Sequence, residues 1–176
     1  MANLILIVSL VIGGLAIFTL RGGRVMYVLL PVLAAAAAVA QIVAVKTAVI
    51  ETLLFYFIVF LIGLSGLYAF MGHAFNADRV AKYIGWPAGN PFQWEVAVSN
   101  LSHAVLGFLC IWIRGNFWAA TVIASSVWLL GCGVGHVREI VKSRNFAPGN
   151  AGPPFISDVV KPLVLIGLLI AYVCGA

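Results

Sequence analysis

The side chains best suited to chemistry in this sequence are three histidines and two carboxylates that lie in or beside long apolar segments. These groups are His73, Glu95, His103, His136 and Asp158. Imidazoles and carboxylates bind divalent metals, and an imidazole also exchanges protons near neutral pH. Because an ionisable group is costly to bury among apolar residues, each of the five is a candidate functional residue.

An internal repeat places four of these groups at equivalent positions. Segment 72–96 aligns with segment 135–159. The positions identical in both copies are, numbered in the first copy, Gly72, His73, Ala88, Gly89, Pro91, Phe92 and Val96. Each copy reads as a helix ending in Gly-His, a loop, and Pro-Phe-x-x-acid at the start of the next helix. We therefore expect two parallel hairpin repeats, related by a pseudo-two-fold axis along a membrane normal.

In such a repeat, the histidines and carboxylates of the two copies would lie at one depth and around one axis. Two imidazoles and two carboxylates suit a divalent metal or a proton relay. The predicted metal ligands are His73, Glu95, His136 and Asp158. The same pattern also fits ordinary helix starts, because proline favours a first turn and an acid is stabilised by the helix dipole. The sequence leaves both interpretations open.

A polar stripe follows one face of segment 92–113. Its members are Glu95, Ser99, Ser102 and His103, with Asn100 beside them. Such a face must turn toward the interior of a membrane bundle. His103 would lie about 12 Å deeper than Glu95, at about 1.5 Å per residue. An interhelical hydrogen bond, a translocation path and a metal or haem ligand are the alternatives for this imidazole.

Other chemical motifs are weak. His136 and Glu139 share a helix face, as in di-iron bundles, but the chain has only five acidic residues and such centres need about four carboxylates facing one another. The cysteines Cys110, Cys132 and Cys174 have no metal-binding spacing and are expected to be free and inert. We find no catalytic motif, so whether the chain is an enzyme stays open.

Three amide side chains are given structural roles. Gln41 lies alone in an apolar segment, where an amide most often makes a hydrogen bond between helices. Asn145 and Asn150 lie in a loop rich in glycine and proline, where turn formation accounts for them without a ligand.

The composition defines the elements that must position these groups. Hydrophobic residues make up 64% of the 176 residues and charged residues 9%, which excludes an ordinary soluble domain. Runs of about 20 apolar residues match a hydrocarbon core of about 30 Å. We expect a single all-α transmembrane domain over residues 1–176, with spans at 3–20, 25–45, 52–71, 92–113, 117–137 and 155–174. The last of these crosses only if Asp158 and Lys161 reach back to the lipid headgroups.

The cations predict an orientation. Most of them fall on one side of a six-span bundle: Arg21, Arg24, Arg79, Lys82, Arg138, Lys142, Arg144 and Lys161, against Lys46 and Arg114 on the other. The positive-inside rule puts both long loops in the cytoplasm and both termini outside. The tryptophans Trp86 and Trp94 would lie at the inner interface, and Trp112 and Trp118 at the outer one. The formal charge of +5 then faces anionic lipid and needs no nucleic acid.

Two loop segments carry a resemblance to a known family. They are 85–95, GWPAGNPFQWE, and 145–153, NFAPGNAGP. From Leu64 onward the chain resembles a family of small bacterial and archaeal multi-span membrane proteins classed as a domain of unknown function. The resemblance implies a protein of the cell (inner) membrane, and it brings no activity and no set of ligands.

Three functional hypotheses follow. In the first, Glu95, Asn100 and His103 line the path of a transporter or channel for a small ion or solute. His73, His136 and Asp158 would gate this path, and their protonation would couple opening to pH. In the second, His73, His103 and His136 bind a metal or haem. In the third, the chain is a structural or accessory subunit, and its polar groups only hold the helices together. Homo-oligomerisation through the small-residue faces at 34–38 and 131–135 is a separate expectation for the bundle.

Overall fold

The computed structural model describes residues 1–19 and 23–175, and every regular element in these ranges is helical. The elements are α1 (Ala2–Thr19), α2 (Gly23–Val45), α3 (Val49–Phe57), the π-helical segment η1 (Ile58–Leu64), α4 (Ser65–Phe75), α5 (Ala77–Ile84), α6 (Phe92–Leu109), α7 (Asn116–Ser143) and α8 (Pro153–Val173). The α3, η1 and α4 segments form one continuous helix. The all-α fold class is thus confirmed. Leu20 and Arg21, which belong to the expected first span and to the charge balance, lie outside the described residues.

Five of the described helices are long and apolar enough to cross a membrane. They are Ala2–Thr19, Arg24–Val45, Val49–Phe75, Asn116–Ser143 and Pro153–Val173. The last qualifies although it contains Asp158 and Lys161. The remaining expected span is α6, which is 18 residues long but carries Glu95, Asn100 and His103 and falls outside the five.

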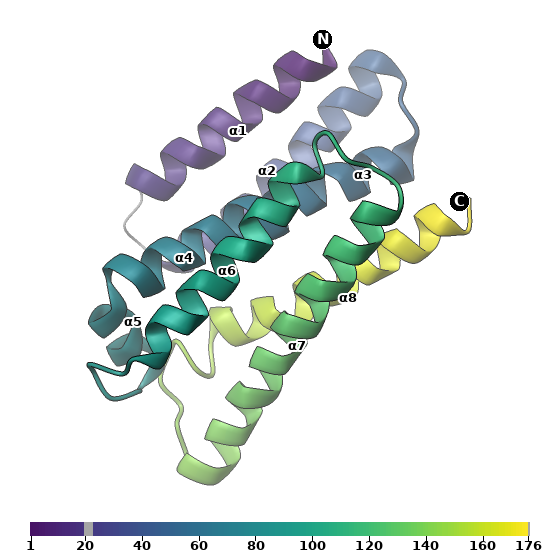
Figure 1. Cartoon of the computed structure of the whole chain (residues 1–176). Coiled ribbons are helices and arrows are strands. Elements are labelled where there is room, and N and C mark those ends of the chain that lie inside the picture. Colours follow the sequence, from purple (N-terminus) through teal and green to yellow (C-terminus); the bar gives the residue numbers. More distant parts are fainter. Residues whose placement is uncertain (20–22, 176) are drawn as a thin grey trace.

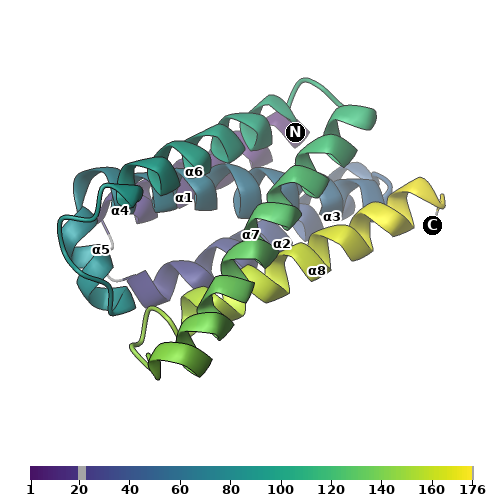
Figure 2. The same ribbon diagram turned by 60° about the horizontal axis from the view of Figure 1, so that its bottom comes forward.

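The long helices run back and forth between two ends of the molecule (Figure 1). Both termini lie at one end, which we name the terminal end. The loops 76–91 and 144–152 lie at the opposite end, which we name the loop end. Near the loop end, α4 and α6 lie on one side of the bundle, and α2, α7 and α8 lie on the other side (Figure 2).

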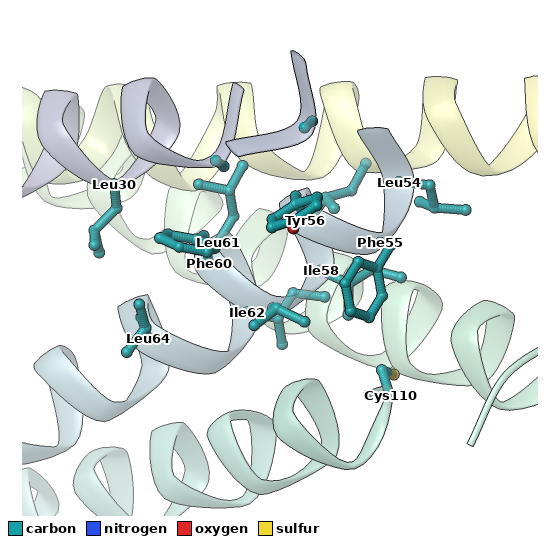
Figure 3. Close-up of a cluster of buried hydrophobic side chains, with 14 of the residues drawn as sticks. Leu30, Leu54, Phe55, Tyr56, Ile58, Phe60, Leu61, Ile62, Leu64 and Cys110 are labelled. Atoms are coloured by element: carbon teal, nitrogen blue, oxygen red, sulfur yellow. The ribbon is translucent and has the colours of Figure 1, made fainter. Parts of the chain in front are cut away.

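A buried apolar cluster fills the bundle toward the terminal end and continues along α1 and α2 as far as Ile17 and Met26. Its centre is the long helix through α3 and η1, where Leu54, Tyr56, Ile58 and Phe60 are fully buried (Figure 3). Other helices complete the apolar cluster with Leu30, Cys110, Trp118, Val122 and Leu165. Side chains that are apolar on every face of a helix are typical of an element buried at the centre of a bundle.

The α4 and η1 segments pack closely against α6 because glycines remove the intervening side chains. A Cβ atom on Gly107 would lie 2.5 Å from the backbone nitrogen of Gly63, and one on Gly66 would lie 2.9 Å from the carbonyl oxygen of Asn100. Small residues allow such approach between helices that cannot use the hydrophobic effect to associate. The π-helical segment lies at this contact, and such segments are frequent at functional sites.

Polar contacts at the terminal end agree with the expected topology. The chain turns between α2 and α3 at Lys46, whose φ is 54°. Arg114, before α7, forms an ion pair of 2.9 Å with Glu51, near the start of α3. The Tyr56 hydroxyl donates to Gln41 Oε1 at 2.9 Å, which confirms the interhelical hydrogen bond predicted for that amide.

Three features differ from the expectations. Residues 77–84, expected as loop, form the short helix α5, which ends at Gly85 with a φ of 85°. The α7 helix extends to Ser143, so His136 lies inside this helix and does not end it. Trp118 is fully buried and donates through Nε1 to the Cys110 carbonyl oxygen, so it does not face a membrane interface.

Candidate functional site

A cavity of about 1300 Å³ lies between the two sides of the bundle and reaches the loop end. We name it the loop-end cavity. Its walls include all three histidines, His73, His103 and His136, together with Asp158 and Asn100. Five of the six residues predicted for a transport site therefore border one space. Glu95 is exposed and does not line the loop-end cavity, which separates it from the others.

His136 is held from both sides of its ring. Its Nδ1 lies 2.7 Å from Asn150 Oδ1, and its Nε2 lies 3.5 Å from Asp158 Oδ2. The Asn150 amide nitrogen donates to the Asn145 carbonyl oxygen at 2.8 Å and to that of His136 at 3.4 Å, which fixes the amide orientation. Nδ1 must therefore carry a proton. A second proton, on either His136 or Asp158, is needed for attraction between Nε2 and the carboxyl group.

His73 has a different partner from the one its repeat position predicts. Its Nδ1 lies 2.5 Å from Oε1 of Gln93, at the start of α6. The equivalent of the contact between His136 and Asp158 would be one between His73 and Glu95. The repeat itself stays a prediction, and its two copies make different hydrogen bonds here.

The predicted metal ring does not assemble. Within residues 1–19 and 23–175, no three His, Cys, Asp or Glu side chains form a group that could hold a metal ion. Of the four predicted ligands, His136 and Asp158 meet, His73 binds Gln93, and Glu95 is exposed. The two loops are not equivalent, because α5 occupies only the first of them, and the two histidines therefore have different surroundings.

The polar side chains on the α6 wall of the loop-end cavity form hydrogen bonds to carbonyl oxygens of α6 itself. His103 Nδ1 donates to the Ser99 carbonyl oxygen at 2.7 Å, and its ring stacks on Trp128 of α7 with centroids 5.9 Å apart. The Asn100 amide donates to the Val96 carbonyl oxygen at 2.8 Å. Ser102, part of the predicted stripe, is exposed. The stripe therefore divides, with Asn100 and His103 facing the cavity.

Lys161 is a site residue that the sequence did not single out. The sequence made the last span conditional on Asp158 and Lys161 reaching the headgroups, whereas Lys161 is 8% exposed and lines the loop-end cavity. Its Nζ donates to Ser65 Oγ and lies 5.9 Å from the centre of the Tyr27 ring. Asp158 and Lys161 are three residues apart and share one face of α8, and this spacing was the sequence signal that could have indicated a polar site inside the bundle.

Two further cavity residues offer buried hydroxyl groups. Among the described residues, Tyr83 Oη and Ser125 Oγ have no hydrogen-bond partner, and both side chains line the loop-end cavity. Ser125 is 2% exposed. Buried polar groups are normally satisfied, so these hydroxyls point to water or a ligand in the cavity. A serine in an apolar segment gives no such signal in the sequence.

The two long loops dock on each other and set the position of Asn150. The Asn145 amide donates to the Ile84 carbonyl oxygen at 3.0 Å, and the Gly149 amide donates to the Tyr83 carbonyl oxygen at 3.0 Å. A Cβ atom on Gly149 would lie 2.7 Å from that Tyr83 oxygen, so only glycine fits without a shift. The Asn150 side chain is consequently fully buried beneath the loop, beside His136.

Comparison with known proteins identifies a family for the chain. Neither the curated proteins nor the solved structures contain a match to it. A family model described as a family of unknown function, DUF6790, matches residues 24–175, so the similarity begins earlier than the expected start at Leu64 and includes α2. The chain therefore belongs to the DUF6790 family.

Proposed function

We propose that this protein is an integral membrane transporter for a small solute, which enters the loop-end cavity and is bound at its inner end. The observation that carries the proposal is the position of polar side chains at depth. His103 and Lys161 lie roughly 16 Å and 12 Å inside their helices at about 1.5 Å per residue, and both line one cavity. Polar groups near the middle of a membrane typically mark substrate or ion pathways.

The apolar cluster supports a transporter over an open pore. It fills the bundle toward the terminal end with fully buried side chains, including Leu54 and Phe60 (Figure 3). Trp118 is fully buried in the same cluster. Release of a solute at that end requires helices around η1 to move. Transporters of this kind expose one site alternately to each side of the membrane.

The contact between His136 and Asp158 supports coupling of this movement to protons. His136 Nε2 lies 3.5 Å from Asp158 Oδ2 beside the cavity, and attraction between these two groups needs a proton on one of them. Loss of that proton would leave a carboxylate facing an imidazole acceptor, and the two groups would separate. Proton relays of histidines and carboxylates are common in membrane transporters.

Osmotic swelling of proteoliposomes tests the proposal across several classes of solute at once. Vesicles with and without the protein are diluted into iso-osmotic neutral, cationic and anionic small solutes. We expect at least one solute to enter faster in the presence of the protein, and His103→Ala to remove most of the increase. Ser102→Ala, at the exposed neighbour outside the cavity, should retain it. Swelling equal to that of empty vesicles for every solute would overturn the proposal.

A further inference from the structure

We propose that the loop-end cavity binds an organic anion, with its carboxylate or phosphate group at Lys161 and its apolar part against the surrounding helices. This inference rests on the proposed function, since it names the chemical class of the solute for the same cavity. Four features carry it: the buried ammonium group, the charge of the cavity, the unpartnered hydroxyls and the apolar walls.

The Lys161 ammonium group lacks a carboxylate partner. Among the described residues, the ion pairs within 4.0 Å join Arg114 to Glu51 and His136 to Asp158, so neither includes Lys161. One of its three N–H bonds is directed at Ser65 Oγ. The side chain is 8% exposed and borders the cavity. A buried, unpaired charge is costly, and an anion in the cavity would compensate it.

The charge of the walls favours an anion along the whole route. The cations that line the loop-end cavity are Arg24, Arg79, Arg138, Lys142 and Lys161. They face only two carboxylates, those of Glu139 and Asp158, and the latter contacts His136. Arg79, Arg138 and Lys142 are exposed near the loop end, whereas Lys161 is deep. Cations along a cleft raise the local concentration of anions and increase their rate of entry.

The remaining walls fit an organic molecule better than a hydrated inorganic ion. Apolar side chains also line the cavity, among them Ile17, Leu61, Ile62 and Leu129. Most polar side chains at depth are already bonded within the protein, Asn100 and His103 to carbonyl oxygens of α6 and Ser65 to Lys161. The hydroxyl of Ser125 is the buried one that has no partner among the described residues. A small inorganic anion would lose more hydration free energy on entering the cavity than its hydrogen bonds to the free polar groups would recover. A molecule with one anionic group and an apolar body recovers energy from both regions.

Equilibrium binding of a matched pair of probes tests the inference. Protein in phosphatidylcholine nanodiscs is titrated with radiolabelled decanoate or with decanol, and binding to empty nanodiscs is subtracted. We expect saturable decanoate binding at about one per chain and weaker binding of decanol. Lys161→Gln should weaken decanoate binding at least about tenfold, the loss expected for a charge-assisted hydrogen bond, and should leave decanol binding unchanged.

Two control variants separate charge from folding. Lys161→Arg retains the positive charge and should bind decanoate within about threefold of the unmodified protein. Lys82→Gln removes an exposed cation of α5 that does not line the cavity, and should also bind normally. Competition by phosphatidylglycerol in the nanodiscs would identify a lipid headgroup as the source of the anion. Competition by soluble octyl phosphate alone would identify a solute from water.

The inference and the transport proposal fail separately. Decanoate binding that Lys161→Gln leaves unchanged, or decanol binding as tight as decanoate, would overturn the anion site whatever the permeability of proteoliposomes. Binding that depends on Lys161, combined with swelling equal to that of empty vesicles, would support the anion site and overturn transport.

Discussion

At the residue scale, the structure brings two of the candidate residues, His136 and Asp158, into contact and adds partners that sequence patterns could not supply. Both residues stood out because ionisable groups are rare in apolar segments. Asn150 did not, because an asparagine in a loop of glycines and prolines is adequately explained by turn formation. Its role depends on how loop 144–152 packs against Tyr83 and Ile84, and contacts between loops have no sequence periodicity.

Asn150→Ala should strongly destabilise the fold. The substitution removes a fully buried acceptor of the His136 Nδ1 proton and two donated bonds, so we expect a loss of about 2 kcal/mol or more. Thermal unfolding in mild detergent measures it. Asn116→Ala, at an exposed position at the start of α7, is the matched control and should change stability by less than about 0.5 kcal/mol. Equal effects of the two variants would contradict the role given to Asn150.

At the element scale, apolar runs located the long helices well, because span length follows from hydropathy. The short helix α5 and the π-helical segment η1 were not predicted. The former carries charged residues, Asp78, Arg79 and Lys82, in a stretch that reads as loop. The latter depends on how Gly63 meets Gly107 on a helix more than 40 residues away in sequence, which a local pattern does not encode.

Gly107→Ala should disturb the contact between η1 and α6. The added Cβ atom would lie 2.5 Å from the Gly63 nitrogen, and overpacking of this kind costs about 1–3 kcal/mol. Gly131→Ala is the matched control, since nothing lies within 4 Å of its added Cβ atom and alanine is the better helix former. Unfolding temperatures of the two variants in the same detergent test the difference. A Gly107→Ala protein as stable as Gly131→Ala would contradict the close packing.

At the scale of the whole molecule, the alternation of helix direction places cations unequally at the two ends. Arg24, Arg79 and Lys142 belong to parts of α2, α5 and α7 that lie toward the loop end, whereas Lys46 and Arg114 lie in the turns after α2 and before α7, toward the terminal end. Figure 1 shows where these elements lie. The loop-end cavity itself was not predictable, because it arises from the separation of α4 and α6 from α7 and α8, and hydropathy says nothing about the spacing of helices.

Reporter fusions test the orientation that this distribution predicts. Alkaline phosphatase is active only outside the cytoplasm, and we expect it to be active when fused to the carboxyl end of this chain. The same reporter fused after Phe146, in the loop that follows α7, should be inactive because the positive-inside rule places this loop in the cytoplasm. The reverse pattern would show that the loop end faces outward.

The central claim is that a cavity accessible from the loop end reaches the middle of the bundle. Two adjacent serines test it most directly. Ser125 and Ser126 are both 2% exposed, but only Ser125 lines the loop-end cavity. Each is replaced by cysteine in a background in which Cys110, Cys132 and Cys174 are alanine, and the protein is treated with a membrane-impermeant thiosulfonate from either side.

We predict that Ser125→Cys reacts at least tenfold faster than Ser126→Cys when the reagent is applied from the loop side, and that neither reacts from the terminal side, where the apolar cluster closes the bundle. Equal rates at the two positions, or a Ser125→Cys protein that resists the reagent from the loop side, would contradict the account.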